Sequence, residues 1–401
     1  MPSQIYLTFV QSRQTKRLMQ YDTSPIFSLP VRRLRWLLLT GVLCLPLWLG
    51  AQEITQSQYK FSDGALYEGE VFRGKPYGKG RTTFTNGDIY EGEYVKGKRQ
   101  GYGVYSFADG ERYEGQWYQD QQHGQGTFYF RNKNRYEGLW FRDYQQGQGT
   151  MHYFNGDVYE GEWQQDKREG QGTYTYSTGD IYKGSWRDDL KDGQGTFIWS
   201  NGARYSGAWR EGKMYGQGTY NYANGDVYKG AFVNDSLEGK GIYRYASGDV
   251  YEGTYHNSQR EGEGIFTYAD GSKYVGQLKG GQKHGAGTFT SPDGTSYTGQ
   301  WRNDKKEGRG KYVWRNGDIY DGSWKADMMD GEGVLRQKDG TKFRGQFREG
   351  KKNGKCIMET ADGTRFEGSY VDDVRDGDFV EKDRNGNVIR RGHYTHGVVD
   401  S

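Results

Sequence analysis

A large aromatic residue recurs at a constant spacing of 23 along most of this chain of 401 residues. The spacing never slips, so residues 67–388 divide into fourteen units, in which we number the recurring aromatic residue as position 1. A fixed period of this length indicates a repeat architecture, in which each unit packs mainly on its neighbours. The recurring residues are Tyr67, Tyr90, Tyr113, Tyr136, Tyr159, Tyr182, Tyr205, Tyr228, Tyr251, Tyr274, Tyr297, Tyr320, Phe343 and Phe366.

Glycine occupies fixed positions of the unit. Positions 3 and 12 are Gly in all fourteen units, position 14 is Gly in twelve, and position 21 is Gly in thirteen. In the unit that begins at Tyr159 these residues are Gly161, Gly170, Gly172 and Gly179. Hydrophobic residues are only 33% of the chain, whereas aromatic residues are 16%. Aromatic rings must therefore supply most of any core.

The ring and glycine positions alternate with polar positions, which is the period of a β-strand. Position 5 is a large ring in most units, and positions 16 and 18 are usually aromatic too. Only Pro76 and Pro292 follow residue 51, which agrees with strands throughout. We therefore predict an all-β fold, an elongated single-sheet solenoid of antiparallel β-hairpins. Each unit should hold two strands joined by a six-residue loop at positions 6 to 11.

The turn between units predicts which positions face each other. A three-residue turn with a left-handed Gly at position 21 pairs position 18 with position 22. Position 16 then faces position 1 of the next unit, position 14 faces position 3, and position 12 faces position 5. The six-residue loop predicts that the same three pairs of positions also face each other inside each unit. The rings can lean over the glycine row, while positions 2, 4, 15 and 17 face water. Lys133 replaces Gly at position 21, so we expect a positive φ and a local irregularity there.

The N-terminal residues differ from the repeats. Arg32, Arg33 and Arg35 precede an apolar run at residues 36–49, which ends shortly before Ala51. This pattern is typical of a secretory signal peptide cleaved after Ala51, and an uncleaved N-terminal membrane anchor is the alternative. Both readings predict an N-terminal apolar helix and export across, or anchoring to, a membrane. The expected compartment is the periplasm, the cell envelope or the extracellular space.

The boundaries of the predicted parts follow from the repeat. The segment before the repeats begins at Met1 or, if translation starts later, at Met19. The predicted parts are the signal peptide or anchor at 1–51, an N-terminal half-repeat cap at 52–66, the fourteen units at 67–388 and a C-terminal half-repeat cap at 389–401.

The charge of the chain argues against nucleic acid as a partner. The chain holds 55 basic and 52 acidic residues, and residues 1–51 contain six of the basic residues and one of the acidic ones. The remaining 49 basic and 51 acidic residues give a net charge of −2, without the concentrated positive charge that nucleic acids require. Cys356 is the only cysteine after residue 51, so no disulfide framework is expected there.

The unit resembles a known repeat. The run YEGEW at residues 159–163, followed by Gly-x-Gly and a turn glycine at a spacing of 23, is similar to the MORN repeat (membrane occupation and recognition nexus). The resemblance covers residues 67–388 and weakens toward the C-terminus, where positions 16 and 18 lose their rings at Leu335, Gln337, Met358 and Thr360. It implies a single-sheet solenoid that acts in scaffolding, membrane association or partner binding, without catalysis.

Two functions remain open from the sequence. The first is an exported, non-catalytic scaffold that binds protein partners or supports assembly at a membrane through its aromatic and glycine surface. The second is a module that binds phospholipid headgroups or glycans directly. We expect no cofactor, no metal, no nucleic acid and no small-molecule substrate. The rings are either this binding surface or simply the core of a thin sheet; the candidate binding residues are Tyr159, Trp163, Tyr182, Trp186, Tyr205, Trp209, Trp301 and Trp314.

Overall fold

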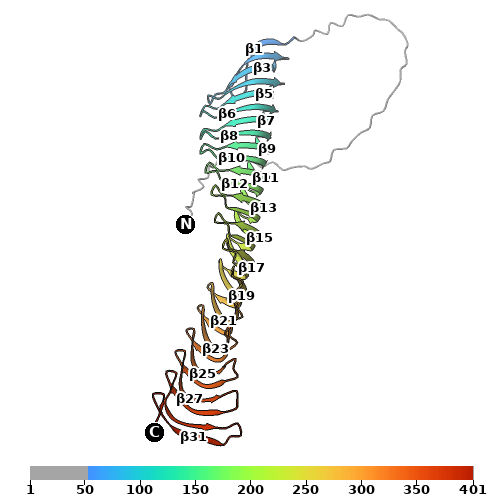
Figure 1. The fold of residues 1–401 in the computed structure, drawn as a ribbon. Helices are drawn as coiled ribbons and strands as arrows, with labels where there is room; N and C mark the ends of the chain where they lie inside the picture. The colour runs from blue at the N-terminus through green and yellow to red at the C-terminus, as the bar shows by residue number, and fades with distance from the viewer. Residues whose placement is uncertain (1–52, 401) are drawn as a thin grey trace, which may run out of the picture. The chain divides into compact units, whose positions relative to one another are not determined.

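The computed structural model describes residues 53–400, which form strands and turns only. Its 32 strands make one antiparallel sheet, in which each strand up to β28 pairs with its neighbours along the chain, and β28 pairs with both β29 and β30 (Figure 1). The predicted all-β, single-sheet fold is therefore confirmed for this part of the chain. No helix long and apolar enough to cross a membrane occurs among residues 53–400. The predicted N-terminal apolar helix and the cleavage site at Ala51 lie outside the described residues.

The strands follow the repeat. The first strand of a unit runs from the residue before position 1 to position 6, and the second runs from position 9 to position 17. The first strands are β2 (Leu66–Phe72), β4 (Ile89–Val95), β6 (Arg112–Tyr118), β8 (Arg135–Phe141), β10 (Val158–Gln164), β12 (Ile181–Arg187), β14 (Arg204–Arg210), β16 (Val227–Val233), β18 (Val250–His256), β20 (Lys273–Lys279), β22 (Ser296–Arg302), β24 (Ile319–Lys325), β26 (Lys342–Arg348) and β28 (Arg365–Val371).

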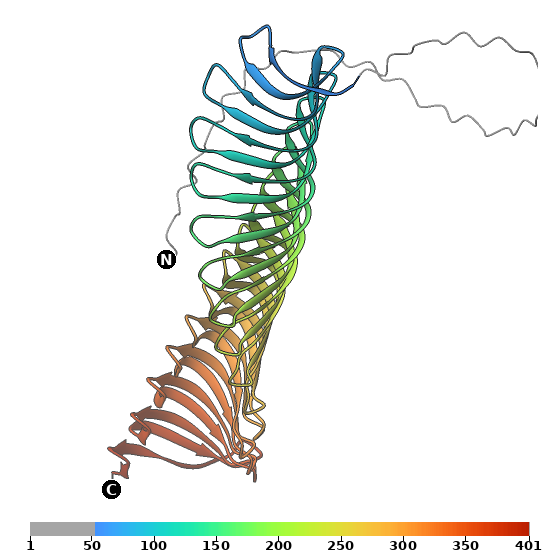
Figure 2. The same cartoon turned by 90° about the horizontal axis from the view of Figure 1, so that it is seen from above.

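The second strands and the two ends complete the sheet. The second strands are β3 (Lys75–Thr83), β5 (Lys98–Ser106), β7 (Gln121–Tyr129), β9 (Tyr144–His152), β11 (Lys167–Thr175), β13 (Leu190–Ile198), β15 (Lys213–Asn221), β17 (Ser236–Arg244), β19 (Gln259–Thr267), β21 (Gln282–Thr290), β23 (Lys305–Val313), β25 (Met328–Arg336) and β27 (Lys351–Glu359). The ends add β1 (Thr55–Lys60), β29 (Val374–Arg375), β30 (Gly377–Lys382), β31 (Val388–Thr395) and β32 (Val398–Val399). Within residues 53–400 the strands are curved and the sheet twists from one end to the other (Figure 2).

The turn between units has the predicted register. Tyr174 pairs with Tyr182, Gly172 with Gly184, and Gly170 with Trp186, as expected for positions 16 and 1, 14 and 3, and 12 and 5. The turn closes when the amide of position 18 donates to the carbonyl of position 22, at 2.9 Å in this unit. Position 21 has φ near +90° in this and most other units, which glycine adopts without strain.

The turn inside the unit differs from the prediction. Tyr159 pairs with Tyr174 and Gly161 with Gly172 as predicted, but position 5 pairs with position 10, and not with position 12. The predicted six-residue loop is therefore wrong: the turn has two residues, Gln165 and Asp166, with φ of 49° and 67°. A bulge after Gly161 shifts the register, because β11 holds more residues than β10 between the glycine row and the turn.

Lys133 takes the positive φ that its position predicts, 67°. Its turn nevertheless keeps the hydrogen bonds of the glycine turns, since the amide of Lys133 donates to the carbonyl of Phe130 at 2.9 Å. The amide of Phe130 also donates to the carbonyl of Asn134 at 2.9 Å. The predicted local irregularity is therefore absent from the hydrogen bonding of this unit.

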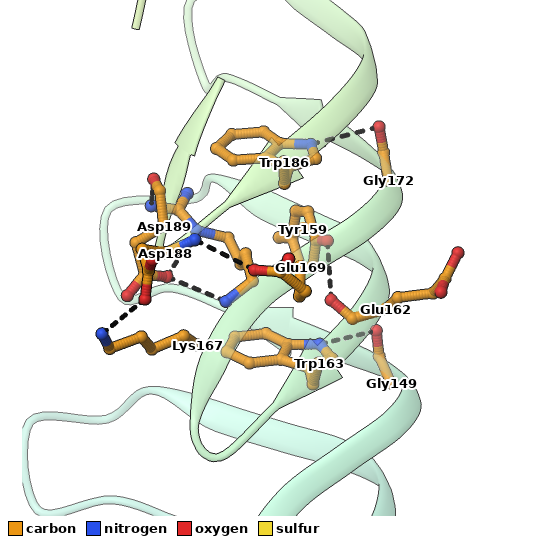
Figure 3. A network of polar contacts seen from close by, with 11 residues as sticks. Gly149, Tyr159, Glu162, Trp163, Lys167, Glu169, Gly172, Trp186, Asp188 and Asp189 are labelled. Carbon is orange, nitrogen blue, oxygen red and sulfur yellow. Dashed lines mark hydrogen bonds and ion pairs between the residues drawn. The ribbon is translucent and has the colours of Figure 1, made fainter. Parts of the chain in front are cut away.

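The core is a layer of rings on one side of the sheet, which we call the ring face. The ring of Tyr159 lies over the glycine row, where a Cβ added to Gly172 would come within 2.4 Å of its Oη. That hydroxyl donates to the carbonyl of Glu162 at 3.0 Å, and the Trp186 Nε1 donates to the carbonyl of Gly172 at 3.3 Å (Figure 3). Tyr159 also contacts Trp163 and Trp186 edge-to-face, with ring centroids 5.2 and 5.3 Å apart. Glycine is required here because any side chain would displace the tyrosine.

Candidate interaction surface

The predicted binding residues lie mostly in this core. The three tyrosines among them, at the first position of consecutive units, are 0% exposed, and the tryptophans at position 5 are 4–7% exposed. Trp314 is half-buried at position 18. The six candidates between Tyr159 and Trp209 form one continuous packed row. Trp301 and Trp314 lie further along the same face. The fully buried members are Tyr159, Tyr182 and Tyr205, and the nearly buried members are Trp163, Trp186, Trp209 and Trp301.

A cation at position 10 packs on these rings, which the sequence pattern alone did not indicate. The guanidinium carbon of Arg168 lies 4.4 Å from the centroid of Trp186 and 5.4 Å from that of Tyr174. Asp189 of the next unit accepts hydrogen bonds from the backbone amide and the Nε of Arg168, each at 3.0 Å. The same position holds a cation over rings at Arg99, Arg168, Lys191, Arg260, Lys283, Lys306, Lys352 and Arg375.

Lys191 shows what happens when the carboxylate is missing. Its Nζ lies 4.4 Å from the centroid of Trp209, but position 8 of the next unit is Gly212. The turn amide of Gly212 donates to the Lys191 carbonyl, so the turn closes without an acid. Burial lowers the pKa of Lys191 to about 8, against the opposing charge of the more distant Asp235. Burial also lowers the pKa of Lys283 and of Lys306, where the nearby Asp304 and Asp327 oppose the shift.

The opposite side of the sheet, the polar face, is hollowed along the glycine row. One hollow of about 570 Å³ and another of about 530 Å³ share Gln171 and Lys183 in their linings, so they form one groove across the strands. Its floor is the backbone of the glycines at positions 3 and 14. Side chains of positions 2, 13 and 15 stand along it, and we call it the glycine groove. The residues that line it between 125 and 229 are Gln125, Glu137, Gly138, Gln148, Gly149, Thr150, Glu160, Gly161, Gln171, Gly172, Thr173, Lys183, Gly184, Gln194, Gly195, Thr196, Ser206, Gly207, Gln217, Gly218, Thr219 and Lys229.

Positions 13 and 15 of the glycine groove are uncharged in these middle units, while position 2 adds Glu137, Glu160, Lys183 and Lys229. Position 13 is Gln and position 15 is Thr in five consecutive units, which repeat the run Gly-Gln-Gly-Thr. Each pair offers an amide and a hydroxyl, groups that both donate and accept hydrogen bonds. The signal for this surface is therefore visible in the sequence, although the strand pattern predicted only that position 15 faces water. The paired residues are Gln125 and Thr127, Gln148 and Thr150, Gln171 and Thr173, Gln194 and Thr196, and Gln217 and Thr219.

The same face becomes charged toward the C-terminus. A hollow of about 950 Å³ lies over the corresponding rows of the last units and contains side chains of both signs. Some of these charges are paired, since Arg365 lies 2.9 Å from Glu367 and Asp378 lies 2.7 Å from His393. The charged lining residues are Arg309, Asp321, Glu332, Arg344, Lys355, Arg365, Glu367 and Asp378.

The reactive side chains do not gather into a cluster. Within residues 53–400 no group of three or more His, Cys, Asp or Glu side chains could hold a metal ion. Burial raises the pKa of Cys356 to about 11, so its thiol is less ionised than a free cysteine at neutral pH. The chemistry that the described surfaces offer is thus hydrogen bonding and charge pairing over an extended area.

The solved structures that match this chain in a structure comparison share little sequence with it. The TCP10 domain of Danio rerio CPAP in complex with a STIL peptide is 14% identical, covers 49% of this chain and 88% of its own, and has a TM-score of 0.31. The Drosophila melanogaster SAS-4 TCP domain in complex with a proline-rich motif of Ana2 is 20% identical, covers 39% and 85%, and has a TM-score of 0.26. A streptogramin B lyase is 13% identical, covers 78% and 89%, and has a TM-score of 0.13. These scores are too low to support an argument about fold or function.

Sequence comparison identifies the repeat itself. No curated protein sequence matches the chain. The MORN repeat model matches thirteen consecutive windows, each as long as one unit, from 67–89 to 343–365. The matched windows begin at the same twelve tyrosines and at Phe343, which start the first thirteen units, and the predicted fourteenth unit, 366–388, lies beyond them. Because these windows cover most of its length, the chain belongs to the MORN-repeat family.

Proposed function

We propose that this protein is a non-catalytic interaction scaffold that holds an extended polypeptide segment of a partner protein in the glycine groove. The observation that carries this proposal is the groove across the strands, floored by glycine backbone and lined by the Gln and Thr of consecutive units. Repeat proteins of this family usually act in protein or membrane interactions, which supports a binding function in general.

The chemistry of the groove favours a polypeptide. Successive units present the same amide and hydroxyl at a spacing of about 9.6 Å, twice the distance between strands. A polypeptide backbone carries a donor and an acceptor at nearly every residue, so it can use both groups in each unit. Single contacts of this kind are weak, but several of them on one rigid frame add up through effective concentration.

The buried rings have an indirect part in this proposal. Tyr159, Trp163 and the equivalent residues of later units have almost no exposed surface, and we propose that they support binding by holding the glycine row in place. Trp314 keeps part of its ring exposed on the opposite face. Partner contact is therefore assigned to the polar face, and the rings are assigned to its geometry.

Export belongs to the same proposal. The basic residues and apolar run before Ala51 favour delivery across a membrane, either with cleavage or with retention as an anchor. N-terminal sequencing of the protein from its native cells distinguishes the two readings. A first residue of Gln52 supports cleavage, whereas a retained Met1 or Met19 supports the anchor.

Site-specific photo-crosslinking tests the binding surface. A benzophenone side chain is placed at Thr196 in the groove and, as a matched control, at Tyr222 on the ring face, in the full chain in its native cells. Crosslinks to a polypeptide from residue 196 and none from residue 222 support the proposal. Crosslinks from residue 222 alone would contradict it. Binding to liposomes or glycans without any polypeptide crosslink would favour the alternative of direct binding to headgroups or sugars.

A further inference from the structure

The junction between the first two units, which begin at Tyr67 and Tyr90, lacks two side chains that fill the ring face at later junctions between units. In the second unit, Tyr105 at position 16 packs on Trp117 with ring centroids 5.9 Å apart, and Arg99 at position 10 lies 4.3 Å from the Trp117 ring. In the first unit these two positions are Thr82 and Pro76. This unit therefore supplies no ring at position 16 and no cation at position 10.

A hollow of about 450 Å³ lies at this place. Thr82 lies beneath it and is 0% exposed, and its Oγ1 is 2.6 Å from the hydroxyl of Tyr94, which is 2% exposed. The rings of Tyr59, Phe61 and Phe84 form part of the lining. The volume falls within the range of about 300–1,000 Å³ that is usual for small-molecule sites. A planar ring placed here would meet the same kind of neighbours as Tyr105 meets in the next unit.

The hollow is also basic. Four cations line it, and two of them, Lys98 and Arg99, are paired with Asp120, at 4.0 and 3.5 Å. The side chains of the other two, Lys75 and Lys96, make no hydrogen bond or ion pair within the described part of the chain. The second carboxylate of the lining, Asp63, accepts a hydrogen bond from the backbone amide of Ala65.

The unpaired lysines have a local cause. Where later turns carry an aspartate at position 8, the turn of this junction is Lys96-Gly97. Pro76 has no amide hydrogen for such an aspartate to accept. The Gly97 amide still donates to the Pro76 carbonyl at 2.9 Å, the same backbone bond that the turns with aspartate make. This turn therefore lacks both the position-10 cation and the position-8 acid, and the side chains of Lys75 and Lys96 remain without a counter-ion.

We propose that this hollow is a binding site for a small molecule that carries a planar ring and an anionic group. The ring packs on Tyr59, Phe61 and Phe84, the partly exposed rings that line the hollow. The anionic group pairs with Lys75 and Lys96, where charge-assisted hydrogen bonds are stronger than neutral ones. This site lies on the ring face, so it is independent of the scaffold function proposed for the polar face.

Calorimetric titration of the full chain with three matched probes tests the ligand class. Phenyl phosphate carries both the ring and the anion, phenol carries the ring alone, and inorganic phosphate carries the anion alone. We expect phenyl phosphate to bind about tenfold or more tightly than either partial probe, since each half of the site adds its own contacts. Equal binding of inorganic phosphate, or no binding of phenyl phosphate at millimolar concentration, overturns the proposal.

Two sets of variants locate the binding. The double variant T82Y/Y94W installs the residues that the next unit carries at these positions, Tyr105 and Trp117, and should abolish binding by filling the hollow while keeping the repeat pattern. The variant K75Q/K96Q should weaken phenyl phosphate by about tenfold or more and leave phenol unchanged. The control K213Q/K305Q removes lysines at position 9 of later units and should have no effect. Undiminished binding to a folded T82Y/Y94W protein overturns the proposal.

Discussion

The ring face and the polar face of the same strands respond to opposite constraints. At Gly184 an added Cβ would lie 2.4 Å from the Cα of Gly195, so the ring face admits no side chain at the glycine row. One residue earlier, Lys183 is exposed on the polar face, and other units carry Glu, Ser, Val or Arg at that position. One residue along the strand therefore separates a position restricted by packing from a position free to vary. The comparison shows that stability and recognition can be changed separately in this sheet.

The largest expected effect comes from removing a ring of the core. Trp163→Ala should cost about 3–5 kcal/mol of local unfolding free energy, because a ring that is 4% exposed is replaced by a cavity. It also loses the hydrogen bond from Nε1 to the carbonyl of Gly149. Hydrogen exchange measured unit by unit should show lost protection in the units beginning at Tyr136 and Tyr159 and little change in distant ones. A uniform loss along the whole sheet would contradict the nearest-neighbour description.

Adding a side chain to the glycine row should be nearly as damaging. Gly184→Val places its Cβ against the backbone of the next strand, which cannot move aside as a flexible side chain can. We expect a loss of about 3 kcal/mol, at the upper end for overpacking. Lys183→Val is the matched control, because it adds the same side chain to the other face of the same strand and should stay within about 0.5 kcal/mol. Chemical denaturation of both variants measures the difference, and equal losses would mean that the two faces are not distinct.

The lowered pKa of Lys191 on the ring face should make the free energy of unfolding depend on pH. Its folded pKa of about 8 lies below the ordinary lysine value of 10.5, so above pH 8 the unfolded chain binds a proton that the folded protein has already lost. The free energy of unfolding should therefore rise with pH from about 8 toward 10.5, as far as this residue is concerned.

The variant Lys191→Met isolates that contribution. Its stability relative to wild type should be highest at pH 7 and should fall as the pH rises to 9.5. Denaturation at a series of pH values measures this difference. Buried tyrosines titrate in the opposite sense at higher pH, since burial raises the pKa of Tyr67 to about 12, so the comparison stays below their range. A pH-independent difference between the two proteins would refute the assignment.

The aspartates that link neighbouring units should have a smaller effect. Asp189→Ala removes the acceptor for the backbone amide of Arg168 and should cost about 1 kcal/mol. Asp189→Asn keeps an acceptor oxygen and tolerates the positive φ of 68°, so it should cost less. The ion pair itself contributes little, because the side chain of Asp189 is 44% exposed. Thermal denaturation of the two variants separates the hydrogen bond from the charge, and equal losses would assign the effect to charge.

The smallest effect on stability is expected in the glycine groove. Replacing Thr173, Thr196 and Thr219 together by Val keeps the strand-forming shape and should change the stability by less than about 0.5 kcal/mol per site. If the groove binds a polypeptide, the same triple variant should lose most of the photo-crosslinking from a benzophenone placed at Gln194. Unchanged crosslinking in the triple variant would place the partner elsewhere.

The sequence predicts the fold from the number of residues in the turn between units, which decides which positions of neighbouring strands face each other. A glycine at position 21 and rings at positions 1 and 16 leave one register that puts the rings together, and Tyr174 opposite Tyr182 confirms it. The prediction of a six-residue loop inside the unit was wrong because the sequence Gln165-Asp166 is not typical of a two-residue turn, although both residues take positive φ. The signal was present across units, since position 8 is Asp or Gly in all but one of them. Both residue types tolerate the left-handed conformation better than most.

The candidate surface was harder to infer because the most conspicuous residues are the core. Tyr159 and Trp163 stand out by size, yet a single sheet has no second layer to bury it, so its own rings must cover the backbone. Gln171 and Thr173 look ordinary in sequence, and they line a groove only because glycine residues lie between them and their neighbours. The guanidinium of Arg168 contacts Trp186 of the next unit. The spacing of residues within a single unit does not reveal such a contact between two units.

The register between units has a consequence for how such a chain changes over evolutionary time. Every junction joins the same positions, as at Gly172 and Gly184, so duplicating or deleting one whole unit leaves each remaining junction with a compatible partner. The length of the groove can then vary in whole steps while its cross-section is preserved. An insertion of a single amino acid inside a strand would instead send every following side chain to the wrong face. Natural variants of this chain should therefore differ in length by whole units or by changes confined to the turns.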